Sequence, residues 1–353
     1  MKKKIYTSLI FILTMIIAII PVLLVAGNIL SVSIGENFTH KNDANIFYAL
    51  KKDSVDVLFL GSSSIGYGIA PIVLWNDAGI TSALRWCGYQ NAMTNYFYLL
   101  DSLESQSPKV VVLDAKTITF NIADFNDGLE PYLRSAIDVL PMSDVKREAI
   151  NKISSLTSNP LSTKLSYYVK FLRYYSYISN LNYVSDYYKL NYGGMILNPY
   201  NLGSAISLKL NSASYDELVL KEGTDVYQCD DLSYEYFIST IEYCLKNGIE
   251  VCITSFPSAD WNIEEHNLIE KICEKYQIEY IDYNTAENLE AIQLDYDQDF
   301  HDTLHLNVYG QIKVSENISR FLVNYYDLED HRDDFSYNQW NIWYEEFSSF
   351  YIN

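Results

Sequence analysis

A Gly-Ser turn is the first group of residues in this chain that could do chemistry. Gly61-Ser62-Ser63-Ser64 follows a short apolar run of the kind that forms a buried parallel strand. In an open α/β sheet, ligands bind beyond the carboxyl ends of the strands. A serine here could therefore be an exposed nucleophile, with backbone N–H groups nearby to hold an oxyanion. Such turns are mostly structural, so the turn alone indicates little.

An Asp/His pair near the C-terminus is the second group. Asp302-Thr303-Leu304-His305-Leu306-Asn307 stands just before a predicted closing helix. Asp302 could accept a hydrogen bond from Nδ1–H of His305, which fixes the tautomer and leaves Nε2 free to take a serine proton. An isolated pair of this kind is more often a surface histidine beside a helix cap. Its combination with the Gly-Ser turn favours a Ser-His-Asp triad.

A metal-dependent hydrolase is a weaker interpretation of the same residues. Asp302 with His301 and His305 could offer ligands, but no matching acidic cluster follows the other predicted strands. The five cysteines show no C-x-x-C spacing of a zinc or redox motif. We therefore predict no metal and no cofactor. We expect buried thiols, although one disulfide is also compatible with the sequence.

The elements that must position these residues alternate between strands and helices. Strands are predicted at residues 54–60, 81–86, 109–115, 248–256 and 277–282. Helices are predicted at 92–103, 233–247, 263–276 and 308–325, with a brief one opening at Pro71 and with Asn307 capping the last. This alternation predicts a mostly parallel α/β sheet with helices on both faces.

A long insertion, roughly residues 120–232, separates the third predicted strand from the fourth. Helical spacing predicts helices at 131–140, 143–155 and around 165–178, and tyrosines are dense from Tyr167 to Tyr200. An insertion at the strand ends could be a lid or specificity cap. Plain helical packing, with tyrosines as amphipathic fillers, is at least as well supported.

The N-terminus predicts a membrane anchor. Residues 5–26 are almost wholly apolar and follow three lysines. At about 1.5 Å per residue they can cross a hydrocarbon core of roughly 30 Å. The lysines place the N-terminus in the cytoplasm and the body outside, as a single-pass protein of the cell membrane with an extracytoplasmic domain. A cleaved signal peptide is the alternative, but its apolar region is normally shorter.

Composition and charge exclude several classes of protein. With 353 residues, 49% hydrophobic and 20% charged, the chain is too apolar for a disordered protein and too charged for a multi-span membrane protein. Its net charge of −20 would repel phosphate backbones, so we expect no nucleic acid partner.

An acidic tail, residues 327–353, closes the chain. Four aromatic residues in it share one helical face: Trp340, Trp343, Tyr344 and Phe347. We expect this face to dock onto its own domain, and a partner, glycan or membrane contact is the less favoured alternative. The predicted organisation is a cytoplasmic stub and anchor (1–35), an α/β domain (36–326) that contains the insertion, and the tail.

The two groups of residues together resemble the SGNH/GDSL hydrolase superfamily. Its first block, a Gly-x-Ser after the first strand, matches Gly61-Ser62-Ser63, and its last block, DxxH, matches Asp302 and His305. Gly88 stands where the superfamily has an oxyanion glycine. The resemblance implies Ser63, Asp302 and His305 as the catalytic triad, with the Ser63 and Gly88 N–H groups as oxyanion donors. It also implies a flavodoxin-like three-layer α/β/α fold.

One block of the superfamily is missing. A Gly-x-Asn-Asp normally follows the third strand, but residues 110–117 (VVVLDAKT) contain no asparagine, so the usual third oxyanion donor is absent. Gln90, Asn91 and Lys116 are candidate replacements. With its anchor and its Gly-Ser-Ser block, the chain resembles the membrane-anchored branch that includes D-alanyl-lipoteichoic acid biosynthesis and alginate O-acetylation proteins.

The resemblance implies a membrane-tethered serine esterase or O-acyltransferase acting outside the cytoplasm. Water as the acceptor would give hydrolysis, and a sugar or polyol hydroxyl would give transfer. The expected substrate is a cell-surface polysaccharide or another acylated polymer, and a membrane-bound O-acyltransferase is a further expected partner. The alternative is a non-catalytic SGNH-like partner or binding module of such a system. The missing block and the aromatic insertion favour that alternative, and the three intact triad residues oppose it.

Overall fold

A parallel five-stranded sheet forms the centre of the protein. The computed structural model describes residues 2–32, 37–122, 130–193 and 195–352. The strands of the sheet are β1 (Val57–Gly61), β2 (Ser82–Trp86), β3 (Val110–Asp114), β4 (Glu250–Ser255) and β5 (Glu279–Asp282). Their spatial order is β2-β1-β3-β4-β5 and every pair is parallel, which is the flavodoxin-like order. The predicted α/β class and parallel sheet are confirmed.

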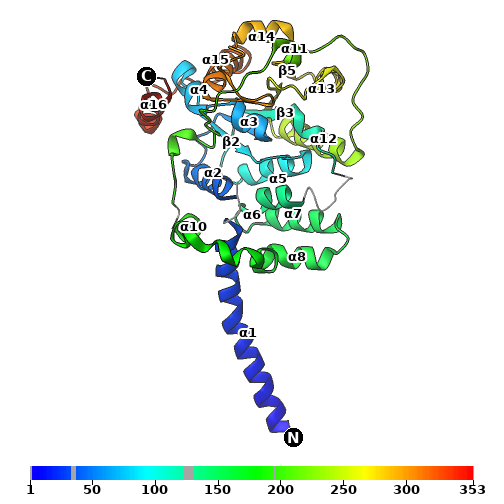
Figure 1. Ribbon diagram of the computed structural model, residues 1–353, viewed down its shortest axis with the longest axis vertical. Helices are drawn as coiled ribbons and strands as arrows, with labels where there is room; N and C mark the ends of the chain where they lie inside the picture. Colours follow the sequence, from blue (N-terminus) through cyan, green and yellow to red (C-terminus); the bar gives the residue numbers. More distant parts are fainter. Residues whose placement is uncertain (1, 33–36, 123–129, 194, 353) are drawn as a thin grey trace.

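Helices cover both faces of this sheet because alternate strand residues point to opposite sides. Leu58 and Leu60 pack into one apolar cluster, and Val57 and Phe59 into another. The first cluster is closed by α2 (Asn37–Ala49), α5 (Ala92–Ser102), α12 (Asp231–Lys246) and α13 (Ile263–Tyr276). The second is closed by α3 (Ser63–Gly68), α4 (Pro71–Ala78), α14 (Ala286–Ile292) and α15 (Val308–Tyr325). The result is three layers (Figure 1).

The insertion is mainly helical. Its elements are α6 (Glu130–Asp138), α7 (Asp144–Ser155), α8 (Pro160–Tyr168), α9 (Phe171–Tyr174), η2 (Tyr175–Tyr183), α10 (Val184–Tyr192), η3 (Pro199–Asn201) and α11 (Tyr215–Leu218). The single helix expected around 165–178 is instead interrupted after Tyr168. Val169 has φ −119° and ψ 78°, which is not a helical conformation, and α9 restarts two residues later.

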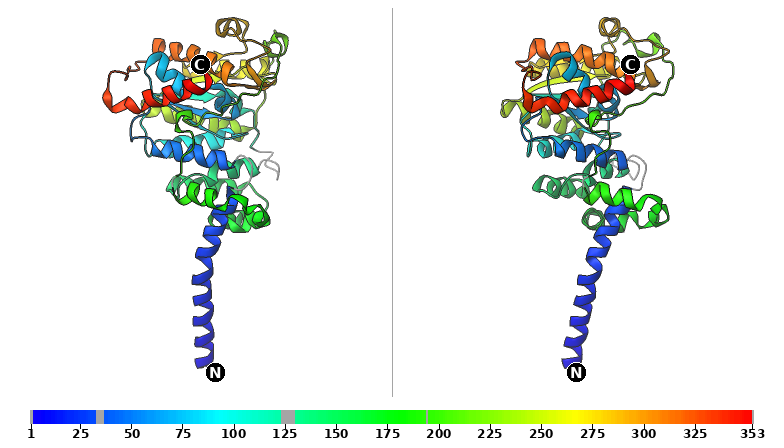
Figure 2. Two further views of the ribbon diagram at one scale, coloured as in Figure 1. Left: turned by 60° about the vertical axis from the view of Figure 1, so that its left-hand side comes forward. Right: turned by 90° about the vertical axis from the view of Figure 1, so that its left-hand side faces the viewer.

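Helix α1 (Lys2–Ser31) projects from one end of the domain, which we call the base (Figures 1 and 2). Its side chains are exposed through much of Ile5–Val25, whereas Leu30 is buried. Among the described residues, Ile5–Ser31 is the helical segment long and apolar enough to cross a membrane, features that a signal sequence shares. The base is formed by α8, α9, η2 and α10, the last three of which contact α1.

The C-terminal tail returns to the domain. Helix α16 (Asn338–Tyr351), preceded by η4 (Phe335–Tyr337), packs on α4. Trp340 and Phe347 are buried there, and the ring centroid of Trp340 lies 5.6 Å from that of Trp75. The predicted docking of the aromatic face onto its own domain is confirmed. All five cysteines are thiols, and four of them are buried.

Candidate active site

The Gly-Ser turn connects β1 to α3 and presents one of its three serines. Ser62 caps α3: its Oγ accepts from the Ser64 N–H at 3.3 Å. Ser62 and Ser64 are buried, whereas Ser63, the first residue of the helix, is half-buried. Helix N–H groups in the first turn have no acceptor within the helix. Ser63 therefore combines an accessible hydroxyl with a backbone donor at the carboxyl end of β1.

A buried aspartate holds this turn in place. Asp114 ends β3, the neighbour of β1, and its Oδ2 accepts from both the N–H (2.9 Å) and the Oγ–H (2.6 Å) of Ser62. Burial raises the pKa of Asp114, while these hydrogen bonds lower it. A Cβ on Gly61 would lie 2.4 Å from the Asp114 Cβ, so only glycine fits this close approach.

Asp114 was not among the residues predicted from the sequence to have a function. The available signal was its position at the carboxyl end of a predicted strand, where flavodoxin-like sheets bind ligands between β1 and β3.

The Asp/His pair lies on a short antiparallel hairpin that was not predicted. Asp302 ends β6 (Phe300–Asp302) and pairs with His305, which opens β7 (His305–Leu306). The Nδ1 of His305 lies 3.0 Å from Oδ1 and 3.2 Å from Oδ2 of Asp302. The Leu304 N–H donates to the same Oδ1 at 2.8 Å. The carboxylate thus holds the Nδ1 edge of the imidazole and fixes the orientation of the ring.

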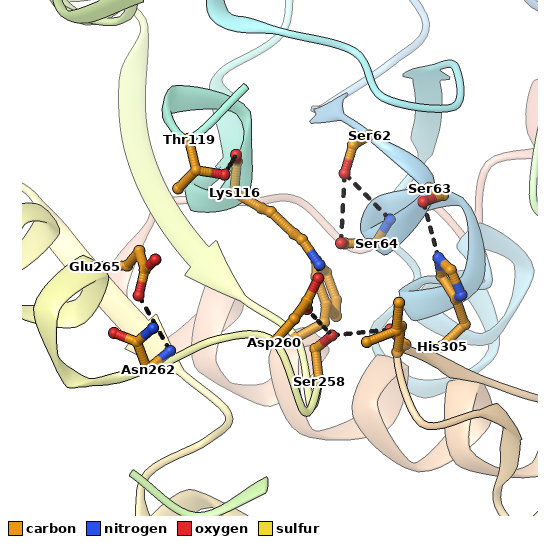
Figure 3. Close-up of polar contacts among 12 residues, drawn as sticks. Ser62, Ser63, Ser64, Lys116, Thr119, Ser258, Asp260, Asn262, Glu265 and His305 are labelled. Carbon is orange, nitrogen blue, oxygen red and sulfur yellow. Dashed lines mark hydrogen bonds and ion pairs between the residues drawn. The ribbon is translucent and has the colours of Figure 1, made fainter. Parts of the chain in front are cut away.

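The other ring nitrogen faces the serine. The Nε2 of His305 lies 2.8 Å from the Oγ of Ser63, a contact shown in Figure 3. The structure therefore brings Ser63, His305 and Asp302 together in the order serine–imidazole–carboxylate. This geometry permits proton transfer from the hydroxyl to the ring.

The charge state of Asp302 suits this arrangement. Burial would raise its pKa, but the neighbouring His305 and the Leu304 N–H outweigh that effect and lower it. Because the Asp302 side chain is 40% exposed, water screens the pair and its contribution to folding stability is small. The carboxylate consequently stays ionised and orients the histidine without being a major stabilising contact.

Two further residues flank the histidine: Tyr67, which was given no role from the sequence, and His301, which was considered there only as a metal ligand. The ring of Tyr67 on α3 lies 4.9 Å from that of His305 and 5.2 Å from that of His301. The Nδ1 of His301 lies 2.6 Å from Ser207 Oγ, and burial lowers the pKa of His301, which favours its neutral form. Tyr67 and His301 thus form one wall of the site.

Of the candidate oxyanion residues, Gly88 lies in the pocket around Ser63, and the three candidates for the third donor lie outside it. Gly88 lines the same pocket as Ser63, next to Tyr89, which has an unusual positive φ of 50°. The Gln90 amide donates to Arg85 and Asn95.

The remaining candidates for the third donor are also engaged. Asn91 caps α5, and Lys116 forms an ion pair with Asp260. None of the three replacements, Gln90, Asn91 or Lys116, lines the pocket around Ser63, so none supplies a third donor in this arrangement.

The pocket around Ser63 has a volume of about 330 Å³. Aromatic side chains form much of its lining: Tyr67, Trp86, Tyr89 and Tyr132. The insertion supplies Tyr132 and Ala205, whereas no described residue of the tyrosine-dense stretch 167–200 lines the pocket. A larger hollow of about 460 Å³ lies near the opposite ends of β3 and β4, but neither serine nor histidine lines it. A further hollow of about 560 Å³ is lined by His266 and Asp282 but by no serine. Of these three hollows, the Ser63 pocket is the one lined by a serine and a histidine in hydrogen-bond contact.

Metal-ligating side chains do not gather here. Within residues 2–32, 37–122, 130–193 and 195–352, no group of three or more His, Cys, Asp or Glu side chains could hold a metal ion.

Comparisons with known proteins add little to this geometry. No protein-family model matches the chain, and no curated protein matches it. One similar solved structure is a protein from Bacteroides fragilis that bears a provisional acylhydrolase name. It is 13% identical, the alignment covers 79% of this chain and 92% of that one, and the TM-score is 0.36. A likeness this weak carries no inference about activity.

Proposed function

We propose that this protein is a membrane-tethered serine esterase or O-acyltransferase that acts on acyl esters of cell-surface polymers. The observation that supports it most strongly is the 2.8 Å contact between Ser63 Oγ and His305 Nε2. Because Asp302 holds Nδ1 of the same ring, the nitrogen that faces the serine is the one free to accept its proton.

The proposed reaction has two halves. In the first, His305 takes the Ser63 proton while Oγ attacks the ester carbonyl, and the N–H groups of Ser63 and Gly88 hold the resulting oxyanion. Protonated His305 then gives its proton to the leaving alcohol, and an acyl-Ser63 ester remains. In the second half, His305 deprotonates water or a polymer hydroxyl, which attacks that ester and releases Ser63.

The missing third donor limits the expected rate. Loss of one oxyanion donor typically costs about 2.7–4 kcal/mol of transition-state stabilisation. Lys116 could replace it only by leaving Asp260, whose Oδ1 also accepts from Ser258 (Figure 3). We therefore expect slow hydrolysis of simple esters unless substrate or a partner moves this ion pair.

The substrate and location are inferred from the anchor and the pocket. Helix α1 would retain the protein in the cell membrane as a single-pass protein, with the α/β domain outside the cytoplasm. A polymer of the cell surface, such as an acylated polysaccharide, would then be within reach. A membrane-bound O-acyltransferase could supply the acyl group from the membrane, and the compact aromatic pocket suits a short acyl chain.

A fluorophosphonate probe tests the nucleophile. Full-length protein in detergent is treated with the probe as wild type, as Ser63→Ala and as Ser64→Ala, which removes a neighbouring buried hydroxyl. We expect labelling in the wild type and in Ser64→Ala, and none in Ser63→Ala. Folded wild type that takes up no label would contradict the proposal and favour a non-catalytic SGNH-like partner of an acyltransferase system.

A partition experiment distinguishes hydrolysis from transfer. A 4-nitrophenyl acetate burst would measure acyl-enzyme formation, and added glycerol would compete with water for the acyl group. Acetylated glycerol in excess over its share of the solvent would indicate a transferase, and acetate alone would indicate an esterase.

A further inference from the structure

A second polar cavity, about 300 Å³ in volume, lies where α1 enters the domain. Helix α1 contributes Leu24 and Asn28 to its wall, and the rest of the lining includes three lysines, Lys41, Lys146 and Lys170. Figures 1 and 2 show α1 leaving the domain at the base. The cavity is therefore bounded by the proposed membrane anchor on one side and by α2, α7, α8 and the C-terminal end of α6 on the other.

The height of the cavity along α1 matches a membrane surface. The apolar segment begins at Ile5, and Leu24 is nineteen residues further along. At about 1.5 Å per residue, this distance is close to the roughly 30 Å thickness of a hydrocarbon core. One turn later the domain surface closes on the helix, since a Cβ on Gly27 would lie 2.3 Å from the Phe171 backbone N. With α1 across a bilayer as proposed, the cavity would lie at the level of the outer lipid headgroups.

The charges around this cavity are not balanced within the described residues. Asp138 is the one carboxylate that lines it. The same carboxylate is already engaged by Arg134, whose guanidinium lies 3.3 Å from Oδ2, and by the Tyr174 hydroxyl at 2.9 Å. The three lysines that line the cavity therefore share a carboxylate that a fourth cation already neutralises.

Capping of α6 explains only part of this cluster. The Lys146 ammonium donates to Leu140 O at 2.7 Å, and the Lys170 ammonium donates to Asp138 O at 2.9 Å, both near the helix C-terminus. Carbonyl oxygens accept hydrogen bonds but do not cancel a full charge. Lys41 makes no hydrogen bond or ion pair with any residue that the structure describes.

Burial and, after it, repulsion between the lysines lower the pKa values of two lysines in the cavity. Burial and the neighbouring Lys170 lower the pKa of Lys41 to about 8. Burial and Lys170 likewise lower the pKa of Lys146 to about 7. An anion in the cavity would raise both pKa values and so favour the charged form of each lysine.

The surface around the cavity suits contact with a membrane. Large apolar side chains are exposed on α8, α9 and η2, among them Leu161 (69%), Leu172 (52%) and Tyr175 (60%). Residues 160–192, which form the base, contain four Lys and Arg against one Asp, in a chain whose net charge is −20. The base therefore differs from the rest of this acidic protein in the two properties that favour an anionic lipid surface.

We propose that this cavity binds the phosphate group of an anionic membrane phospholipid, seated between α1 and the lysines Lys41, Lys146 and Lys170. The lipid tails would lie along the exposed apolar face of α1, and the phosphate would supply the missing negative charge. The inference rests on the proposed membrane anchor and is independent of the chemistry at Ser63.

Native mass spectrometry of the full-length protein in detergent tests this binding. The probes are dioleoylphosphatidylglycerol, dioleoylphosphatidylcholine and inorganic phosphate, and the variants are Lys41→Gln and Lys41→Gln/Lys170→Gln. The control is Lys164→Gln, a lysine of α8 that does not line the cavity. We expect one retained phosphatidylglycerol, bound more tightly than phosphatidylcholine, and a loss of affinity of about fivefold per lysine removed.

Three results would overturn the proposal: equal retention of the two lipids, an equal loss of affinity in Lys164→Gln, or displacement of the lipid by inorganic phosphate at similar affinity. If the double variant unfolds, Lys41→Gln decides alone because its ammonium has no partner within the described protein. The measured mass also reports whether α1 is retained. Fluorophosphonate labelling of the same samples keeps failure at this cavity distinct from failure at Ser63.

Discussion

The residues around Ser63 and those around Asp138 form two polar clusters that differ in how they balance charge. At the edge of the sheet, the Ser63 hydroxyl faces His305, and His305 faces one ionised carboxylate. Where α1 enters the domain, three cations, Arg134, Lys146 and Lys170, act on Asp138, and Lys41 lines the same cavity. The first cluster is complete within the chain, whereas the second lacks negative charge. The proposed lipid phosphate would supply the negative charge that the second cluster lacks, whereas the first needs no added ion.

The largest expected effect tests the completeness of the first cluster. In Asp302→Asn, the amide cannot hold the reactive tautomer of His305, so kcat for a short-chain nitrophenyl ester should fall about 10⁴-fold. Thermal denaturation should show almost no change, because Asp302 is half-exposed. The control is Asp297→Asn, an exposed aspartate just before the hairpin. A loss smaller than tenfold would remove Asp302 from the mechanism.

The corresponding change at the base should show the opposite pattern. Asp138→Asn removes the one carboxylate among the buried cations, so the free energy of unfolding should fall by about 3–5 kcal/mol. Fluorophosphonate labelling of Ser63 in the folded fraction should remain. Urea denaturation and labelling of one preparation measure both effects.

Lowering the pH should also remove the stabilisation that the Asp138 carboxylate provides. Burial would raise the pKa of Asp138, but Arg134, Lys170 and Lys146 outweigh it and hold the pKa below its usual value. The stabilisation is therefore present above pH of about 4 and is lost as the pH falls through the folded-state pKa. Below that pH the wild type and Asp138→Asn should converge in stability. Asp144→Asn, at an exposed site, is the control, and equal destabilisation by both variants would contradict the prediction.

A smaller effect is expected at the residue that supports the nucleophile. In Asp114→Asn, one amide oxygen replaces two carboxylate oxygens that together accept from Ser62 and the Lys116 N–H. We expect a stability loss of about 1–3 kcal/mol and labelling of Ser63 that is roughly tenfold slower. Unchanged labelling kinetics in a destabilised variant would show that Asp114 supports the fold and not the position of Ser63.

The smallest expected effect is a change in stability on removal of Lys41, which tests whether the lysine cavity lacks negative charge. Lys41→Met removes a buried cation that has no partner within the described protein, so the unfolding free energy in lipid-free detergent should rise by about 1 kcal/mol. Phosphatidylglycerol should reduce or reverse this gain, since only the wild type then gains a counter-ion. Lys164→Met should show neither effect. Destabilisation of Lys41→Met without lipid would contradict the charge imbalance.

Local signals in the sequence were sufficient for the central fold. Helix α15 spans Val308–Tyr325 as predicted because the Asn307 side chain accepts from the N–H groups of Tyr309 and Gly310. The strands were found because a parallel sheet buried on both faces needs continuous apolar runs. The break after Tyr168 was missed because its backbone conformation depends on packing around α1, which no local pattern reports.

The candidate site was predictable where its residues are local and hidden where it depends on tertiary contacts. Asp302 and His305 are three residues apart, and Ser63 follows a recognisable strand, so each could be proposed directly. Asp114 supports Ser62 across two strands, and the hairpin that joins Asp302 to His305 has only a three-residue and a two-residue strand. Such contacts become visible only once the sheet is assembled.

The junction of α1 with the domain has a mechanical consequence. The last turns of α1 are packed into the base, with Leu30 buried and Gly27 against the backbone of Phe171, so α1 is a rigid mount. A flexible linker would let the domain move through a range of heights above the membrane and a range of orientations. With α1 in a bilayer, the pocket would instead stay at one height and face one direction. Its polymer would have to come to that level, and the protein would search for it by lateral diffusion alone.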